Sequence, residues 1–152
     1  MSTVSAEPKL FGNFGIKAEL LILFAFSLSL AVYDAMYYFL QYYHNGRNGV
    51  FNGIFFGILV VLQSVGSLMG FLMIHRNSQV FTQKIWKVIA LLFVISNFMG
   101  FIGLIFKAFT GNWVAFVVLD TLLFLVSVTI LWLTIHRMRV YKNWEQLRHN
   151  EE

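Results

Sequence analysis

The sequence contains no cysteine, and this absence excludes several kinds of chemistry. Disulfides, thiolate nucleophiles, iron–sulfur clusters and cysteine-ligated zinc sites all require this residue, as do membrane thiol oxidoreductases. Proline is almost absent as well, because the single proline stands at position 8, before the long apolar stretches begin. Those stretches therefore lack the proline-broken helices that mark many transporter substrate sites.

Charge is the third scarce feature of the chain. Only 12% of the residues are charged, about half of the roughly 25% found in soluble domains. Hydrophobic residues make up 59%, and 17 of them are phenylalanines. A chain with so few charges is unable to cover its own surface in water. The composition therefore predicts an integral membrane protein without a second domain.

Four apolar stretches are long enough to cross a hydrocarbon layer of roughly 30 Å as helices. We predict an all-α membrane protein, an antiparallel bundle of four transmembrane helices with short loops. A single transmembrane domain is expected at 16–136, between a loosely ordered tail at 1–15 and a charged tail at 137–152. The predicted spans are about 16–43, 53–75, 85–109 and 113–135.

Basic residues are distributed unevenly between the two sides of these spans, which sets the expected orientation. One side has only Arg47 and Lys107. The other side collects Lys9, Lys17, Arg76, Lys84, Lys87, Arg137, Arg139, Lys142 and Arg148. We therefore expect both termini to be cytoplasmic, in a multi-pass protein whose membrane the sequence does not identify.

The span 53–75 is rich in glycine and is the predicted centre of the bundle. At 100° per residue, Gly53 and Gly57 share one side with Ser64, and Gly66 and Gly70 share a second side with Gln63. In the third span, Gly100 and Gly103 also share a side. Small residues at this spacing let helix backbones approach closely in lipid, so two strips would pack two neighbours. The alternative is that glycine is simply common in membrane helices.

Polar side chains are predicted to lie at similar depth in all four spans: Asp34, Gln63, Asn97 and Asp120. At 1.5 Å per residue, both aspartates lie roughly 12–14 Å from the non-cytoplasmic end of their helices. Lys107, near that end, is placed to reach toward Asp120. A charged aspartate at this depth costs about 3 kcal/mol, so the aspartates are expected to face the bundle interior.

Three interpretations of this polar layer remain open from the sequence. In the first, the aspartates are structural and are hydrogen-bonded to amides or hydroxyls, or one is paired with Lys107. In the second, they titrate and bind a proton or a cation. In the third, they form a polar patch that docks a partner's transmembrane helix. Glu19 is expected to pair with Lys84 or Lys87. His75 and His136 are interpreted as interfacial anchors, since no third metal ligand is in sight.

The tail beyond His136 carries basic residues and Trp144. It is expected either to continue the fourth helix out of the membrane or to lie along an anionic leaflet. Alternatively, these basic residues are the positive charges that ordinarily flank the cytoplasmic ends of transmembrane helices.

The sequence contains no His-x-x-x-His pair, no Gly-x-Ser-x-Gly elbow and no phosphate-binding loop. We therefore predict no enzyme, cofactor, metal site or nucleic-acid partner. The expected function is that of a non-enzymatic tetraspan protein. It would act by lateral helix packing with other transmembrane helices, as an accessory or assembly subunit, or in trafficking or membrane organisation. The alternative is a small proton- or cation-coupled transporter or channel subunit that uses Asp34 and Asp120.

Overall fold

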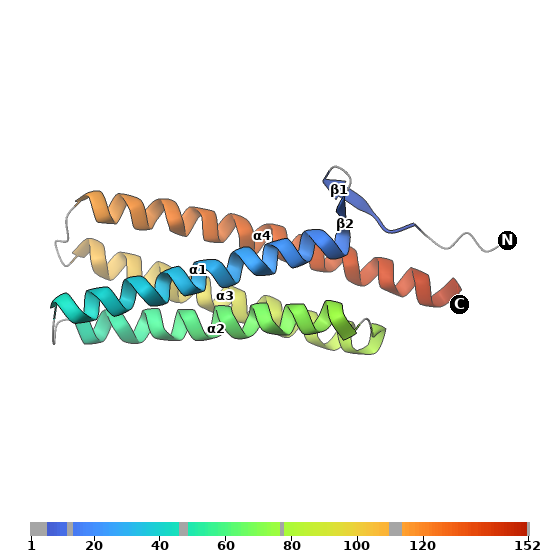
Figure 1. The fold of residues 1–152 in the computed structure, drawn as a ribbon, viewed down its shortest axis with the longest axis horizontal. Coiled ribbons are helices and arrows are strands. Elements are labelled where there is room, and N and C mark those ends of the chain that lie inside the picture. The colour runs from blue at the N-terminus through green and yellow to red at the C-terminus, as the bar shows by residue number, and fades with distance from the viewer. Residues whose placement is uncertain (1–5, 12–13, 46–48, 77, 110–113, 152) are drawn as a thin grey trace.

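The predicted four-helix architecture is confirmed by the structure, a computed structural model that describes residues 6–11, 14–45, 49–76, 78–109 and 114–151 (Figure 1). All four helices are long and apolar enough to cross a membrane. They are joined by short connections. The helices are α1 (Ile16–Asn45), α2 (Gly49–Arg76), α3 (Gln79–Phe109) and α4 (Val114–Glu151).

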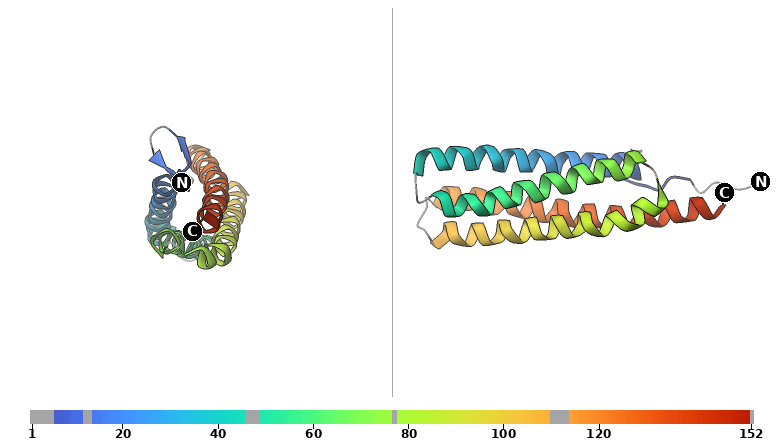
Figure 2. Two further views of the ribbon diagram at one scale, coloured as in Figure 1. Left: turned by 90° about the vertical axis from the view of Figure 1, so that its right-hand side faces the viewer. Right: turned by 90° about the horizontal axis from the view of Figure 1, so that it is seen from below.

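The helices form a closed ring, in which each packs against its sequence neighbours and α4 packs against α1 (Figure 2). The end of the bundle that carries the start of α1 and the end of α4 is termed the terminal end, and the opposite end the loop end. Helices α1 and α4 lie closest near the terminal end and diverge toward the loop end (Figure 1). The cytoplasmic location of the terminal end stays a prediction.

The apolar core fills the terminal half of the bundle. Phe24 of α1 stacks on Phe93 of α3 with ring centroids 6.3 Å apart, and it contacts Phe71 of α2 edge-on at 6.0 Å. The rest of the core consists of buried side chains from all four helices: Ile16, Leu20, Met73, Ile74, Ile89, Met138 and Tyr141. This aromatic and aliphatic packing fixes α1, α2 and α3 against one another.

Glycines of α2 make this close packing feasible, through one side of the helix. A Cβ atom at Gly70 would overlap the Phe24 ring of α1. A Cβ at Gly66 would lie 3.2 Å from the Phe93 ring of α3. At Gly57, by contrast, a Cβ would meet nothing within 4 Å. The strip of Gln63, Gly66 and Gly70 therefore serves both neighbours, whereas two strips were expected.

Two more of the predicted packing glycines, Gly100 and Gly103, lie on α3. A Cβ at Gly100 would lie 3.0 Å from the end of the Leu59 side chain, and one at Gly103 would lie 3.6 Å from the Phe56 ring. Both glycines thus face α2 across the α2–α3 interface. The surroundings of Gly53 lie outside the described part of the chain.

The outer faces of the helices are strongly apolar. Along α2, for example, Val61, Leu68 and Leu72 are each more than half exposed. Apolar surface of this extent is rare on soluble monomers, because water would have to hydrate it. Lipid chains are its natural environment, as the length and composition of the four helices also indicate.

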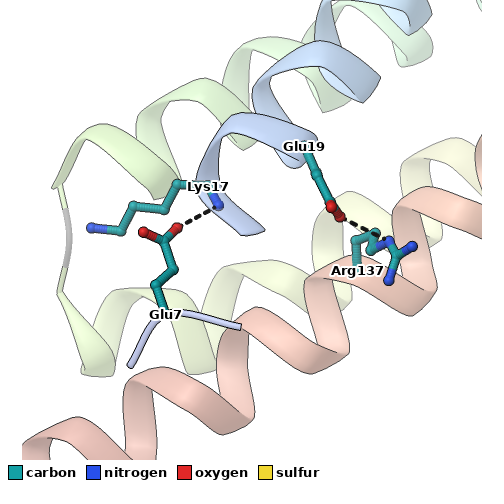
Figure 3. A network of polar contacts seen from close by, with 4 residues as sticks. All are labelled: Glu7, Lys17, Glu19 and Arg137. Carbon is teal, nitrogen blue, oxygen red and sulfur yellow. Dashed lines mark hydrogen bonds and ion pairs between the residues drawn. The ribbon is translucent and has the colours of Figure 1, made fainter. Parts of the chain in front are cut away.

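The predicted loosely ordered tail at 1–15 contains a small antiparallel hairpin, β1 (Lys9–Phe11) with β2 (Phe14–Gly15). The Glu7 carboxylate accepts a hydrogen bond of 3.0 Å from the backbone N–H of Lys17 (Figure 3). The N–H of Ile16 also donates to the Pro8 carbonyl. The first backbone N–H groups of a helix have no partner within the helix, and two of them at the start of α1 are hydrogen-bonded in this way. The negative charge of the Glu7 carboxylate also interacts favourably with the positive end of the helix dipole.

A buried ion pair joins α1 to α4 at the same end. Glu19 Oε2 lies 3.1 Å from Arg137 Nε (Figure 3). The sequence analysis named Lys84 or Lys87 as the partner, but the structure gives this role to Arg137 because α1 packs on α4 here. Both lysines are exposed, whereas Glu19 is buried.

The charged tail after His136 continues α4 without a break as far as Glu151. Its inner side is buried, including Met138, Tyr141 and Glu145, which explains why the helix persists. Lys17 of α1 lies 5.6 Å from the centre of the Trp144 ring, a further contact between the two helices. The tail thus continues the fourth helix, while its position relative to the membrane stays a prediction.

We predict that Gly70→Leu destabilises the bundle by roughly 1–3 kcal/mol or more, because the new side chain must displace the Phe24 ring. Gly57→Leu is the matched control, on the same helix but with open space around it. Unfolding of both variants in detergent, followed by circular dichroism, measures the difference. Equal stability of the two variants would contradict the packing described here.

We also predict that Glu19→Gln and Arg137→Gln each destabilise the fold by roughly 3–5 kcal/mol, since each leaves a buried charge without its ion-pair partner. The double variant should lose clearly less than the sum of the two. A double-mutant cycle of unfolding free energies measures this coupling. Additive losses would show that the pair is not coupled.

Candidate functional site

A cavity of about 60 Å³ lies among the four helices, and we term it the polar cavity. Its polar lining is Asp34, Gln63, Ser96, Asn97, Asp120 and Ser127, with residues from every helix. These side chains lie on the loop-end side of the Phe24–Phe93 stack, where α1 and α4 diverge. The volume accommodates a few water molecules or one small ion with part of its hydration shell.

Helical periodicity brings these residues to the interior. On α4, Asp120 and Ser127 are seven residues apart and so share one face. On α1, Ser27 and Asp34 have the same spacing, and Ser27 is buried. Asp34 and Asp120 are both half-buried and both line the polar cavity, so neither projects into the lipid region.

Gln63 is the central hydrogen-bonding residue of the site. Its buried side-chain amide donates to the Ser27 carbonyl at 3.0 Å and to the Ser27 hydroxyl at 3.2 Å. Its carbonyl oxygen accepts from the Ser96 hydroxyl at 3.4 Å. One side chain of α2 thus links α1 and α3 at the depth of the cavity.

A second link joins α3 to α4. The Ser127 hydroxyl donates to Asn97 Oδ1 at 3.0 Å, while Asn97 Nδ2 donates to the Phe93 carbonyl of its own helix. Together with Gln63, this bond ties three successive helix pairs. Helices α1 and α4, which diverge at this level, contribute one aspartate each to the cavity.

A smaller polar space of about 10 Å³ continues the site toward the terminal end. It shares Gln63, Asn97 and Ser127 with the polar cavity, and it adds Ser27 and Thr134. Phe93 also lines it and stacks on Phe24. The stacked rings of Phe24 and Phe93, which we term the aromatic layer, thus lie between the polar cavity and the buried Glu19–Arg137 pair.

Four of the five residues named from the sequence as a polar layer therefore line one cavity: Asp34, Gln63, Asn97 and Asp120. The side chain of Lys107 lies outside the described residues. Sequence reasoning did not identify the role of Ser27 and Ser96 as partners of Gln63. Their spacing with Asp34 and Gly100 signals an inward face, but which residue they bond depends on how the helices are rotated.

The oxygen-rich lining can hold water, a proton or a small cation. Carboxyl, amide and hydroxyl oxygens are ligands of hard cations. Among the described residues, however, no group of three or more His, Asp or Glu side chains is placed to hold a metal ion. The lining of the polar cavity thus combines two carboxyl groups with amide and hydroxyl side chains.

Comparison of the chain with protein-family models, curated proteins and solved structures found no match. The class of protein follows from its own features, and these define a multi-pass, all-α bundle with a polar interior.

We predict that Gln63→Leu destabilises the bundle by roughly 1–2 kcal/mol, because it removes three hydrogen bonds between helices that are each worth about 0.6 kcal/mol. Ser29→Ala is the control, since the exposed Ser29 hydroxyl donates only to Ala25 of its own helix among the described bonds. Thermal unfolding in detergent measures both variants. A loss no larger than that of the control would argue against a linking role for Gln63.

Proposed function

We propose that this protein is a non-enzymatic tetraspan membrane protein that acts by lateral packing with other transmembrane helices. Such a protein serves as an accessory or assembly subunit, in trafficking or in organising the membrane. The supporting observation is the separation of side chains between the inside and the outside of the bundle. Polar groups gather in the interior, while large apolar side chains cover the outer faces of all four helices.

The outward side chains include bulky aromatic residues. Phe39 is 69% exposed on α1, Phe98 is 61% exposed on α3, and Trp132 is 66% exposed on α4. Association of helices in lipid depends on van der Waals packing, because the hydrophobic effect does not distinguish helix from lipid there. Large side chains on several faces supply contact area for this packing. On α2, the open space at Gly57 would let the backbone of a partner helix approach closely.

The polar cavity favours a second candidate function, a small proton- or cation-coupled transporter or channel subunit. Two carboxyl groups from different helices line one space inside the membrane region, an arrangement that is typical of proton relays and ion sites. In this function Asp34 and Asp120 would be the coupling groups. The divergence of α1 and α4 toward the loop end suits access to the cavity from that side (Figure 1).

One pair of substitutions separates the two functions. If the protein acts by lateral packing, Asp34→Asn with Asp120→Asn should leave assembly largely intact, because an amide has nearly the shape of a carboxyl group and also forms hydrogen bonds. Purification of the wild type and the variant in gentle detergent, followed by mass spectrometry of co-purifying membrane proteins, should then give the same partners.

The contrary result is equally concrete. A pH-dependent ion or proton flux in liposomes that is present in the wild type and abolished in the double variant would support the transporter. A wild type that purifies without any membrane partner, either a second copy or another protein, would contradict lateral packing. Gln63→Leu serves as a control for loss of flux by mere destabilisation, since it leaves both carboxyl groups in place.

A further inference from the structure

Exposed apolar side chains are joined by exposed basic side chains near the terminal end on three helices. On α2, the exposed Leu72 is followed one turn later by the exposed Arg76. On α3, Lys87 is exposed beside apolar neighbours, and on α4 the exposed Trp132 precedes the exposed Arg139. Such a transition marks the depth at which lipid headgroups replace acyl chains.

Three acidic side chains at the terminal end, among the described residues, make contacts within the protein. Glu7 lies over the start of α1, where it accepts a hydrogen bond from the Lys17 N–H. Glu19 is buried with Arg137, and Glu145 is fully buried and accepts from the Tyr141 hydroxyl at 3.5 Å. These carboxylates are therefore withdrawn from the surface that the exposed basic residues occupy.

Five basic residues make up a basic collar around α2, α3 and α4 at this level: Arg76, Lys84, Lys87, Arg139 and Lys142. Aromatic rings position two of them. The Arg76 guanidinium lies 5.0 Å from the centre of the Phe81 ring, and Lys142 Nζ lies 5.3 Å from that of Trp86. Cations over aromatic faces at a membrane boundary are held near the headgroups rather than extended into water.

We propose that the basic collar binds the phosphate groups of anionic phospholipids in the leaflet at the terminal end. Charge complementarity supports this choice of ligand. The exposed apolar side chains next to the collar lie among lipid chains, so the anions beside the collar are the phosphate groups of lipid headgroups. Two of the collar residues, Arg139 and Lys142, belong to the tail, and the other three lie on α2 and α3. Beyond His136, α4 continues as one helix, and its inner side is buried (Figure 1).

This lipid site is independent of the function proposed above. The collar lies on the outer surface at the terminal end, whereas the polar cavity lies inside the bundle on the other side of the aromatic layer. Each basic residue near an anionic surface strengthens binding by about fivefold. Several lipids bound in this way would stabilise the folded bundle by mass action.

The test uses the full-length chain, purified in non-ionic detergent. The midpoint of thermal unfolding is measured with increasing phosphatidylglycerol, with phosphatidylcholine and with inorganic phosphate. We expect phosphatidylglycerol alone to raise the midpoint. Combined substitution Lys84→Gln, Lys87→Gln and Arg139→Gln should weaken its apparent affinity by roughly 100-fold, about fivefold for each charge removed.

Charge-preserving substitution of the same three residues, Lys84→Arg, Lys87→Arg and Arg139→Lys, is the matched control and should keep the effect. High ionic strength should reduce the phosphatidylglycerol effect on the wild type, since exposed charges are screened. Equal stabilisation by phosphatidylglycerol and phosphatidylcholine would overturn the proposal. So would a full effect of inorganic phosphate, an unchanged response of the glutamine variant, or a response that is independent of salt.

Discussion

The scarcity of water within a bilayer is the constraint on which this structure depends. Polar groups in hydrocarbon must find partners inside the protein, so helices turn their hydroxyl, amide and carboxyl groups toward one another. Here Gln63 meets serines from two neighbouring helices, and Asn97 meets Ser127. The outward surface is left to side chains that lose nothing in lipid. One solvent property thus explains both the polar cavity and the apolar exterior.

The bundle divides along its length into two halves with different physical character. In the terminal half, Phe24, Phe71 and Phe93 pack closely because Gly66 and Gly70 leave space for their rings. The Glu19–Arg137 pair then holds α1 to α4. In the loop half, α1 and α4 diverge and a polar cavity replaces the close packing. A closely packed half therefore adjoins a half that has room for water or an ion.

The terminal end shows a second kind of sorting, between charges of opposite sign. Glu7, Glu19 and Glu145 are used for helix capping and for internal contacts. Arg137 is buried with Glu19, whereas Arg76, Lys84, Lys87 and Arg139 are exposed. The hairpin is part of this arrangement, because it carries Glu7 to the start of α1. A segment that looked like a loose tail has a structural role.

The sequence by itself determined the class of this protein: four long apolar stretches and few charges allow only a helical bundle in lipid. It also indicated the depth of Asp34, Gln63, Asn97 and Asp120, because depth follows from the number of residues along a helix. Only the tertiary structure decided which neighbour each side chain meets, as with Arg137 in place of Lys84 for Glu19. Rotation and pairing of helices depend on the fit of many side chains at once, such as Phe24 against Gly70. Spacing along one helix carries no information about that fit.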